Sequence, residues 1–511
     1  MNSATPVPPA RRRRGLAAIA IPILAILAFV CWAFASPVGA SPDDDFHLVS
    51  VWCAETSSQE LCAPGASHDE RLVSPDLITN AYCYAVDPAV SADCQRFGDD
   101  LDENLSPTDR GNFDGLYPPV YYFAMSAFAG HDLQTSALTM RVFNSVLYVV
   151  FVTLLFFLLP IHRRTTLVAS IVVTLVPLGM FLIPSNNPSG WALLSAATLW
   201  IALLGYFETH GWRRAALGAV AVASTVIGAG TRADSAIYAG VAIVAVLVLT
   251  ARRTREFLVA CILPAVLAAM AIVSFLGSGQ TSAAATGLAG PDRAGYTPYT
   301  LIVTNFLDLP WLLTGPFGTW KLGWLDTDMP SIVSFASIAV FGAALLAGLA
   351  SRSRRKTIAS LFVLALVVAV PMYLLYKSDA LVGQQVQPRY ILPLIILLTG
   401  IVLLRVTDRP WRVTSPQVWL VVAALTVANS VALHTNLRRY VTGSDEGGGN
   451  LDFNAEWWWN LPVSPMGVWA IGSIAFAATL AWLGFVLLHH LRTDSLDAVS
   501  SDNRKQHTAS I

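Results

Sequence analysis

Charged residues are scarce in this sequence. Asp, Glu, Lys and Arg make up 13% of its 511 residues, whereas hydrophobic residues make up 55%. A globular chain usually carries about 25% charged residues, so roughly half of the usual solvating charge is missing. This shortage excludes a soluble enzyme, a nucleic-acid-binding protein and a disordered scaffold. The mean hydropathy of +0.57 indicates a chain that dissolves in lipid.

Long uncharged runs predict membrane helices. A helix needs about 20 apolar residues to cross a bilayer, within a range of about 17–25. Such runs occur at 16–36, 138–160, 167–183, 190–207, 215–230, 235–250, 257–276, 331–350, 357–376, 390–404, 416–433 and 466–488. The sequence therefore predicts an all-α polytopic membrane protein with about 12 transmembrane helices, in a membrane domain at 16–490.

Basic residues gather in alternate gaps between these runs. They form clusters at 11–14, 163–164, 213–214, 252–255, 352–356, 405–412 and 492–505. Because Lys and Arg mark cytoplasmic loops, we expect both termini in the cytoplasm. Residues 1–15 are then a basic N-terminal segment. The polar residues 491–511 are expected to form a disordered cytoplasmic tail.

The first run has two interpretations. Four arginines, an apolar run and Val38-Gly39-Ala40 also fit a secretory signal with a small-residue cleavage site. The apolar run is longer than the roughly 7–15 residues of a signal peptide, so an uncleaved anchor is favoured. Cleavage would leave the rest of the topology unchanged.

The opposite side of the membrane carries long loops, at 37–116, 277–330 and 434–465. The first holds 16 acidic residues against three arginines. It also holds four of the six cysteines: Cys53, Cys62, Cys83 and Cys94. An even set in an extracytoplasmic loop predicts two disulfides, with three pairings open. A zinc site is disfavoured because the spacings do not form Cys-x2–4-Cys pairs.

Three adjacent carboxylates follow the first run, at Asp43, Asp44 and Asp45, and His47 comes next after Phe46. Adjacent like charges raise a pKa unless a cation lies among them. The triplet therefore suits either a general base near the membrane surface or a hard-cation site, with a divalent cation at Asp43 and Asp44. A solvated acidic run is the competing interpretation.

Other polar residues on this side are further candidates. Asn187 lies in a polar turn between two apolar runs, and Arg232 lies two residues before Asp234, with which it can pair. Lys377 follows one run, while Arg389 and Tyr390 begin the next. A guanidinium at the membrane boundary can grip a phosphate through two hydrogen bonds. Snorkelling to lipid headgroups is the alternative for Arg389.

Several short motifs resemble those of a family of bacterial membrane proteins, DUF2142, which are themselves similar to GT-C-type glycosyltransferases. The resemblance runs from about Asp43 to Tyr390. It rests on Pro42-Asp43-Asp44 with His47, Tyr117-Pro118-Pro119-Val120-Tyr121-Tyr122, Arg141, Asn187-Pro188-Ser189-Gly190 and Gln387-Pro388-Arg389-Tyr390. The chain departs from the family pattern at four positions, where Asp44 replaces Glu, Tyr117 replaces His, Ser189 replaces Asp and Pro388 replaces Gly.

The resemblance implies a GT-C-like enzyme of the bacterial plasma membrane. Such an enzyme takes a sugar from a polyprenyl-phosphate donor and gives it, with inversion, to an envelope glycan or lipid acceptor on the outer face. Asp43 or Asp44 would deprotonate the acceptor, and Arg389 would stabilise the departing phosphate, with Arg232 and Lys377 as lesser candidates. The implied substrate-binding set also includes Asp45, His47, Asn187 and Tyr390.

Two other functions compete with this one. A transporter or flippase of lipid-linked glycans would place charged or broken-helix sites near the bilayer midplane. Here the polar residues gather at the outer ends of nearly uncharged runs, which favours chemistry at the membrane surface. A non-catalytic assembly protein of the envelope, with the acidic loop as a docking surface, is the third option. Membrane lipid is an expected partner in every case, and nucleic acid is not.

Overall fold

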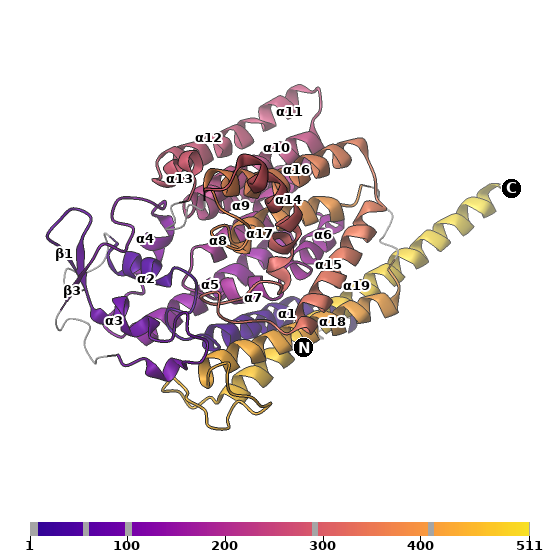
Figure 1. Cartoon of the computed structure of the whole chain (residues 1–511). Helices are drawn as coiled ribbons and strands as arrows, with labels where there is room; N and C mark the ends of the chain where they lie inside the picture. The colour runs from indigo at the N-terminus through magenta and orange to yellow at the C-terminus, as the bar shows by residue number, and fades with distance from the viewer. Residues whose placement is uncertain (1–8, 55–60, 98–104, 289–294, 407–412, 510–511) are drawn as a thin grey trace, which may run out of the picture.

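The structure is a computed structural model that describes residues 9–54, 61–97, 105–288, 295–406 and 413–509. Within these ranges, side chains are described for residues 19–282 and 285–489. The chain folds mainly into helices packed as a bundle, with a small sheet at one end (Figure 1).

Within the described residues, eight helical segments are long and apolar enough to cross a membrane. This finding confirms a polytopic helical protein. The eight are α5 (Leu133–Leu158), α8 (Ser189–Glu208), α10 (Ala233–Thr250), α11 with α12 (Arg255–Ala260 and Ile262–Leu276), α15 (Ser331–Leu349), α16 (Arg354–Lys377), α18 (Ser415–Val441) and the first part of α19 (Pro465–Ala509).

The other four predicted spans do not meet this criterion. The apolar part of α1 (Pro9–Phe34) and all of α17 (Pro388–Leu403) are shorter, and α9 (Gly211–Ala229) begins with two arginines. The run 167–183 is broken into α6 (Ile161–Val172) and α7 (Leu178–Leu182). Pro177 lies between them, and proline cannot donate the backbone hydrogen bond that a continuous helix needs.

Local sequence signals set several helix boundaries. The side chain of Asp132 caps α5 by accepting from the Thr135 amide, and Ser353 caps α16 in the same way. Thr414 and Gln417 form a reciprocal capping box at the start of α18. Helix α17 begins at Pro388, whose fixed φ suits the first helical position. This start places Arg389 in the first turn of α17, a helix that is almost entirely buried.

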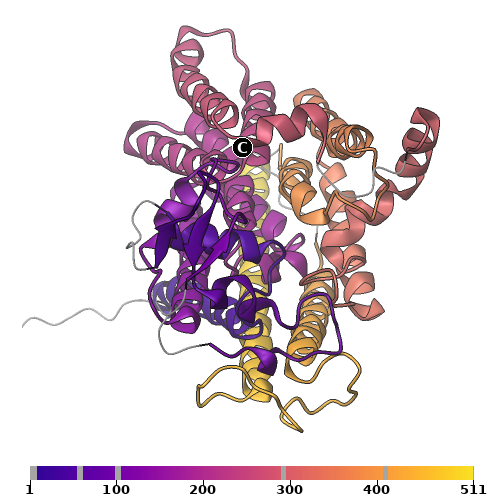
Figure 2. The same cartoon turned by 60° about the vertical axis from the view of Figure 1, so that its left-hand side comes forward.

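The described residues between 37 and 126 form what we call the disulfide end of the molecule (Figures 1 and 2). It contains α2 (Asp44–Trp52), α3 (Pro75–Ile78), α4 (Val120–Ser126) and two short 3-10 turns, η1 (Asn80–Tyr82) and η2 (Ala92–Cys94). Its antiparallel sheet has the order β1 (Cys62–Pro64), β2 (Arg71–Val73), β3 (Ser106–Thr108). Cys53 bonds to Cys62 and Cys83 to Cys94. The two predicted disulfides are confirmed, and their pairing is sequential.

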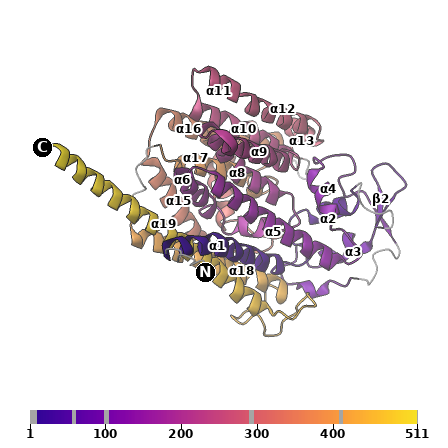
Figure 3. The same cartoon turned by 180° about the vertical axis from the view of Figure 1, so that it is seen from behind.

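The disulfide end has its own apolar core, separate from that of the bundle. Trp52, Leu77 and Tyr84 are fully buried in it, and Tyr440 and Trp458 join it from α18 and the loop that follows. On the far side of the bundle, α1 packs against α19, and α19 against α18 (Figure 3). Helix α18 also contacts η2, so this group of helices reaches the disulfide end.

Two segments differ from the sequence predictions. The predicted loop 277–330 contains α13 (Gln280–Thr286), α14 (Pro298–Thr314) and η3 (Gly315–Phe317). Helix α14 mixes apolar residues with Thr, Asn and Asp, so it lacks the continuous apolar run that marks a span. The composition of 491–511 predicts a disordered tail, but α19 continues as a helix to Ala509. A helix satisfies its backbone hydrogen bonds internally, even where few apolar residues are available for packing.

Candidate functional site

The partners of the carboxylate triplet depend on how Asp43 is held, and the backbone of Asp43 is unusual. Asp43 immediately precedes α2 with φ of 62°, in the left-handed region. Such a conformation is uncommon for residues other than glycine, although Asp adopts it more readily than most. The Asp43 carbonyl accepts from the amides of Phe46 and His47, but its side chain does not cap the helix. That carboxylate is therefore available for other partners.

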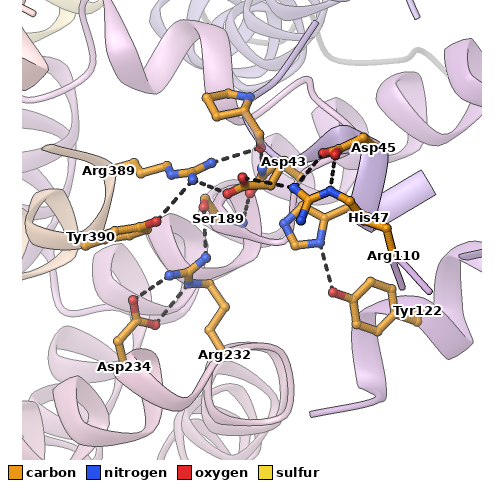
Figure 4. Close-up of polar contacts among 12 residues, drawn as sticks. Asp43, Asp45, His47, Arg110, Tyr122, Ser189, Arg232, Asp234, Arg389 and Tyr390 are labelled. Atoms are coloured by element: carbon orange, nitrogen blue, oxygen red, sulfur yellow. Dashed lines mark hydrogen bonds and ion pairs between the residues drawn. The ribbon is translucent and has the colours of Figure 1, made fainter. Parts of the chain in front are cut away.

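The partner of Asp43 is Arg389 (Figure 4). The Arg389 Nη2 atom forms an ion pair with Asp43 Oδ2 and also donates to the Tyr390 hydroxyl at 3.1 Å. Nη1 donates to the Pro42 carbonyl at 2.9 Å. The Arg389 side chain is only 3% exposed, whereas that of Asp43 is 37% exposed. The pair thus joins a buried cation to an anion that solvent or a ligand can reach.

The electrostatic setting keeps Asp43 ionised. Burial by itself raises the pKa of this carboxyl, but the positive charge of Arg389, its hydrogen bond and the nearby Arg110 outweigh burial. The pKa of Asp43 is consequently lowered from its usual value. Asp43 is an anion at neutral pH, as a base must be.

The three carboxylates of the triplet point to different partners. Asp44 is fully buried, and its Oδ2 accepts from the Ser41 amide at 3.1 Å. Burial raises the pKa of Asp44 to about 7, against the opposing effects of Arg141 and the Ser41 hydrogen bond. Asp45 forms an ion pair with Arg110, which also lies 3.7 Å from Asp43 Oδ1.

This divergence does not fit the predicted divalent-cation site at Asp43 and Asp44. In the part of the chain that the structure describes, no group of three or more His, Cys, Asp or Glu side chains converges to hold a metal ion. The charges of Asp43 and Asp45 are instead matched by two guanidinium groups, and Asp44 is held by a backbone amide.

His47 is buried within a set of aromatic rings. Its Nδ1 is 2.9 Å from the Tyr122 hydroxyl. Its ring stacks on Tyr122 and meets the rings of Phe46 and Tyr117 edge-on. Burial is the largest of the effects that lower the pKa of His47 to about 3. The imidazole is therefore neutral at physiological pH. Its Nε2 has no hydrogen-bond partner among the described residues.

Arg232 lies beside this cluster but is already occupied. Its Nε and Nη2 donate to the two oxygens of Asp234 at 3.0 and 2.7 Å, as the sequence indicated. Its Nη1 lies 3.4 Å from the Ser189 hydroxyl. The Tyr390 ring lies near both arginines, 5.2 Å from the Arg232 guanidinium carbon and 5.1 Å from that of Arg389. These distances fit cation–π contacts.

Asn187 joins the Asn187-Pro188-Ser189-Gly190 motif to the segment around Pro42 and Asp43. Its amide donates to the Pro42 carbonyl at 2.8 Å, so this one carbonyl accepts from both Asn187 and Arg389. The Asn187 side-chain oxygen accepts from the Ser189 amide at 2.9 Å. Segments near residues 42, 187 and 389 therefore meet at a single position.

Lys377 is the one predicted candidate that lies apart. Its exposed ammonium lies 5.9 Å from the Tyr373 ring, and among the described contacts none joins it to Asp43 or Arg389. The sequence prediction that it helps to stabilise a phosphate gains no geometric support.

Sequence reasoning missed Arg110 and Lys321 and named Arg141 only as part of the family resemblance. Arg110 lies 65 residues from its partner Asp45, and no local pattern links them. Arg141 binds the carbonyls of Ala33, Ser36 and Pro37 at the end of α1, and so fixes the segment that leads to the triplet. Lys321 lines a small pocket next to Arg389. A basic residue in a predicted outer loop runs against the charge bias. That signal could have marked Lys321 as a candidate, but not its place beside Arg389.

Comparison with known proteins identifies the family of the chain but indicates no substrate. No curated protein matches the sequence. The sequence model of DUF2142, described as a predicted membrane protein, matches residues 26–398. This region is more than half of the chain, and it contains the whole Asp43–Arg389 cluster. The chain therefore belongs to the DUF2142 family of membrane proteins.

Proposed function

We propose that this protein is an inverting membrane glycosyltransferase that moves a sugar from a polyprenyl-phosphate donor to a cell-envelope acceptor. One observation carries the proposal: a solvent-accessible carboxylate, Asp43, lies in direct contact with a buried guanidinium, Arg389, at one end of an apolar bundle. A base and a cation for the leaving group are the two elements that such a transfer requires.

In the proposed step, the acceptor hydroxyl attacks the anomeric carbon of the donor sugar. Its O–H bond breaks and the proton passes to the Asp43 carboxylate, while a new bond forms between the acceptor oxygen and the anomeric carbon. The bond from that carbon to the phosphate oxygen breaks, and its electron pair leaves with the polyprenyl phosphate. The transition state has oxocarbenium character on the sugar, and Arg389 stabilises the charge gathering on the phosphate.

The resting ion pair gives this step a built-in order. While Arg389 holds Asp43, the carboxylate is a weak base because its pKa is lowered. A donor phosphate that binds Arg389 competes for the same guanidinium and adds a negative charge beside Asp43. Both effects raise the proton affinity of Asp43. The base is therefore strengthened only when the donor is in place.

The remaining residues of the cluster act as positioning residues in this proposal. Asp44 has no exposed surface, so it cannot touch a substrate and instead holds the turn at Ser41. Asn187 fixes the Pro42 carbonyl, and Asp234 holds Arg232 beside Tyr390. Of the two carboxylates suggested by the resemblance, Asp43 is the one we propose as the base.

The test compares lipid-linked sugars in cells that lack the gene and carry either the wild-type protein or a variant. We expect Asp43→Asn to leave the donor accumulated and the envelope acceptor unmodified, at normal protein levels. Asp69→Asn, an exposed carboxylate in the same acidic segment, is the matched control and should restore transfer.

Two results would argue against an enzyme. Normal envelope glycans with Asp43→Asn would remove the proposed base. Accumulation of the donor on the cytoplasmic leaflet alone would favour a flippase, because a transferase that acts outside leaves its unused donor on the outer leaflet.

A further inference from the structure

A small pocket beside the Asp43–Arg389 pair has a lining of two chemical kinds. Arg389 and Lys321 are its cationic lining residues. The rest of the lining is largely apolar and includes Leu178, Phe181, Leu182, Trp320 and Leu325. A pocket of this kind fits a ligand with an anionic head and an apolar body, and its polar side adjoins the proposed base.

One donor of Arg389, a lining residue of this pocket, is unpaired among the described residues. Arg389 is almost fully buried, yet its Nε has no hydrogen-bond partner among the described residues, although both terminal nitrogens are engaged. A buried donor without an acceptor is costly, and more so when it is charged. An oxygen of a bound anion would satisfy it.

Lys321 is the cation best placed to share that anion. Its Nζ lies 2.9 Å from Asp328 Oδ2, and the two side chains are 48% and 76% exposed. An exposed pair of this kind contributes little stability, so the ammonium can exchange Asp328 for a phosphate at small cost. Arg232 cannot do so, because both oxygens of Asp234 already hold it and it does not line the pocket.

The break in the chain before α7 brings apolar side chains to the pocket. Because 167–183 does not form a continuous helix, the short helix α7 can place Leu178, Phe181 and Leu182 against the pocket. The pocket volume is about 20 Å³, which holds roughly one water molecule. A ligand chain must therefore displace the segment Trp320–Leu325, which also carries Lys321 and is a loop between η3 and α15 rather than a spanning helix.

From these observations we infer that the pocket binds the phosphate and the first isoprenoid unit of a polyprenyl phosphate, with Lys321 and Arg389 as the two phosphate ligands. The inference deepens the proposed function and rests on it for the identity of the lipid chain. It assigns Lys321 a role that neither the sequence motifs nor the family match gave it. The sugar then lies on the exposed side of Asp43, outside the pocket.

The test measures binding to the full chain in nanodiscs of zwitterionic lipid. The probes are polyprenyl phosphate, phosphatidic acid and inorganic phosphate. We expect polyprenyl phosphate to bind most tightly, and Lys321→Gln to weaken its binding about tenfold by loss of a charge-assisted contact. Lys321→Arg should retain binding. Lys377→Gln, the matched control on another outer cation, should bind like the wild type.

Three outcomes would overturn the inference: unchanged binding by Lys321→Gln, equal binding of phosphatidic acid, or equal binding of inorganic phosphate. The last two identify a general anion site without selectivity for the isoprenoid chain. Equal melting temperatures for Lys321→Gln and Lys321→Arg confirm that a loss of affinity does not come from misfolding.

Asp43→Asn separates this inference from the proposed function. It removes the base but leaves both phosphate ligands, so it should bind polyprenyl phosphate at least as tightly as the wild type while losing transfer. Lipid binding without transfer by the wild type would sink the proposed function and leave the pocket assignment intact. The opposite result is sugar transfer that requires Asp43, together with normal transfer and normal lipid binding by Lys321→Gln. That result would support the proposed function and overturn the pocket assignment.

Discussion

At the scale of single residues, the site depends on how three adjacent carboxylates are kept apart. Asp43 contacts Arg389 and remains accessible, Asp44 is fully buried and held by a backbone amide, and Asp45 contacts Arg110. The left-handed conformation of Asp43 begins this divergence, because it turns the chain sharply at the start of α2. Only one carboxylate is left to face a substrate.

Asp44 should make stability depend on pH. Its pKa is about 7 in the folded protein and near the ordinary 3.8 when unfolded, so the folded state holds the proton more tightly. The contribution of Asp44 to the free energy of unfolding is therefore fully present at low pH. It is lost as the pH rises from about 4 to 7, which lowers the free energy of unfolding by up to about 4 kcal/mol. Asp44→Asn should remove this fall, since its side-chain oxygen can still accept from Ser41.

The measurement is the melting temperature of the purified protein between pH 5 and pH 8. The wild type should lose stability across this range relative to Asp44→Asn, whereas Asp69→Asn should follow the wild type. Parallel curves for the wild type and Asp44→Asn would show that the buried carboxyl does not carry a raised pKa.

At the scale of elements, a buried ion pair connects the pocket wall to the disulfide end. Arg439 of α18 donates to Asp326 at 2.7 Å, and both side chains are almost wholly buried. The same guanidinium donates to the carbonyls of Tyr84, Asp87 and Val90. These carbonyls lie within the ring closed by Cys83–Cys94. Arg439 therefore holds three separate elements in one arrangement.

Removing either partner of this pair should be strongly destabilising. Arg439→Gln leaves the Asp326 charge buried without a cation, which costs roughly 3–5 kcal/mol. Lys321→Gln breaks the exposed pair with Asp328 in the neighbouring loop and should cost at most about 1 kcal/mol. Denaturant unfolding of both variants checks the contrast. Similar losses for the two would mean that burial does not distinguish these pairs.

At the scale of the whole molecule, the sequence predicts class and organisation better than it predicts helix number. Composition indicates a polytopic helical membrane protein, and the cysteine set predicts two disulfides; both predictions are confirmed. The predicted twelve spans become eight long apolar helices among the described residues. The difference arises where apolar composition persists but Pro177 breaks a helix, or where a run such as α17 is short.

The site is only partly readable from the sequence. Short motifs near residues 42, 187 and 389 identified segments that meet in the fold, because each carries polar residues at the end of an apolar run. The sequence could not show that Arg110 reaches Asp45, or that Lys321 lines the pocket beside Arg389. In both cases the two residues lie more than 60 positions apart in the sequence, so their proximity depends on tertiary packing alone.

The orientation in the membrane is itself a prediction at this scale. Basic clusters place the gaps at 163–164 and 252–255 in the cytoplasm and the disulfide end outside. In a background with Cys31 and Cys261 changed to Ala, Glu446→Cys should react with a membrane-impermeant maleimide on intact cells. Arg253→Cys should react only after permeabilisation. Both positions are exposed, so labelling of Arg253→Cys in intact cells would contradict this orientation.

The measurement that tests the account most directly is release of polyprenyl phosphate from a lipid-linked sugar by the purified protein in liposomes that also contain the acceptor. The wild type and Asp69→Asn should release it at the same rate, and Asp43→Asn should be slower by a factor of about 100 or more, as expected for loss of a general base. Release by Asp43→Asn at the wild-type rate would contradict the assignment of Asp43, and with it the proposed mechanism.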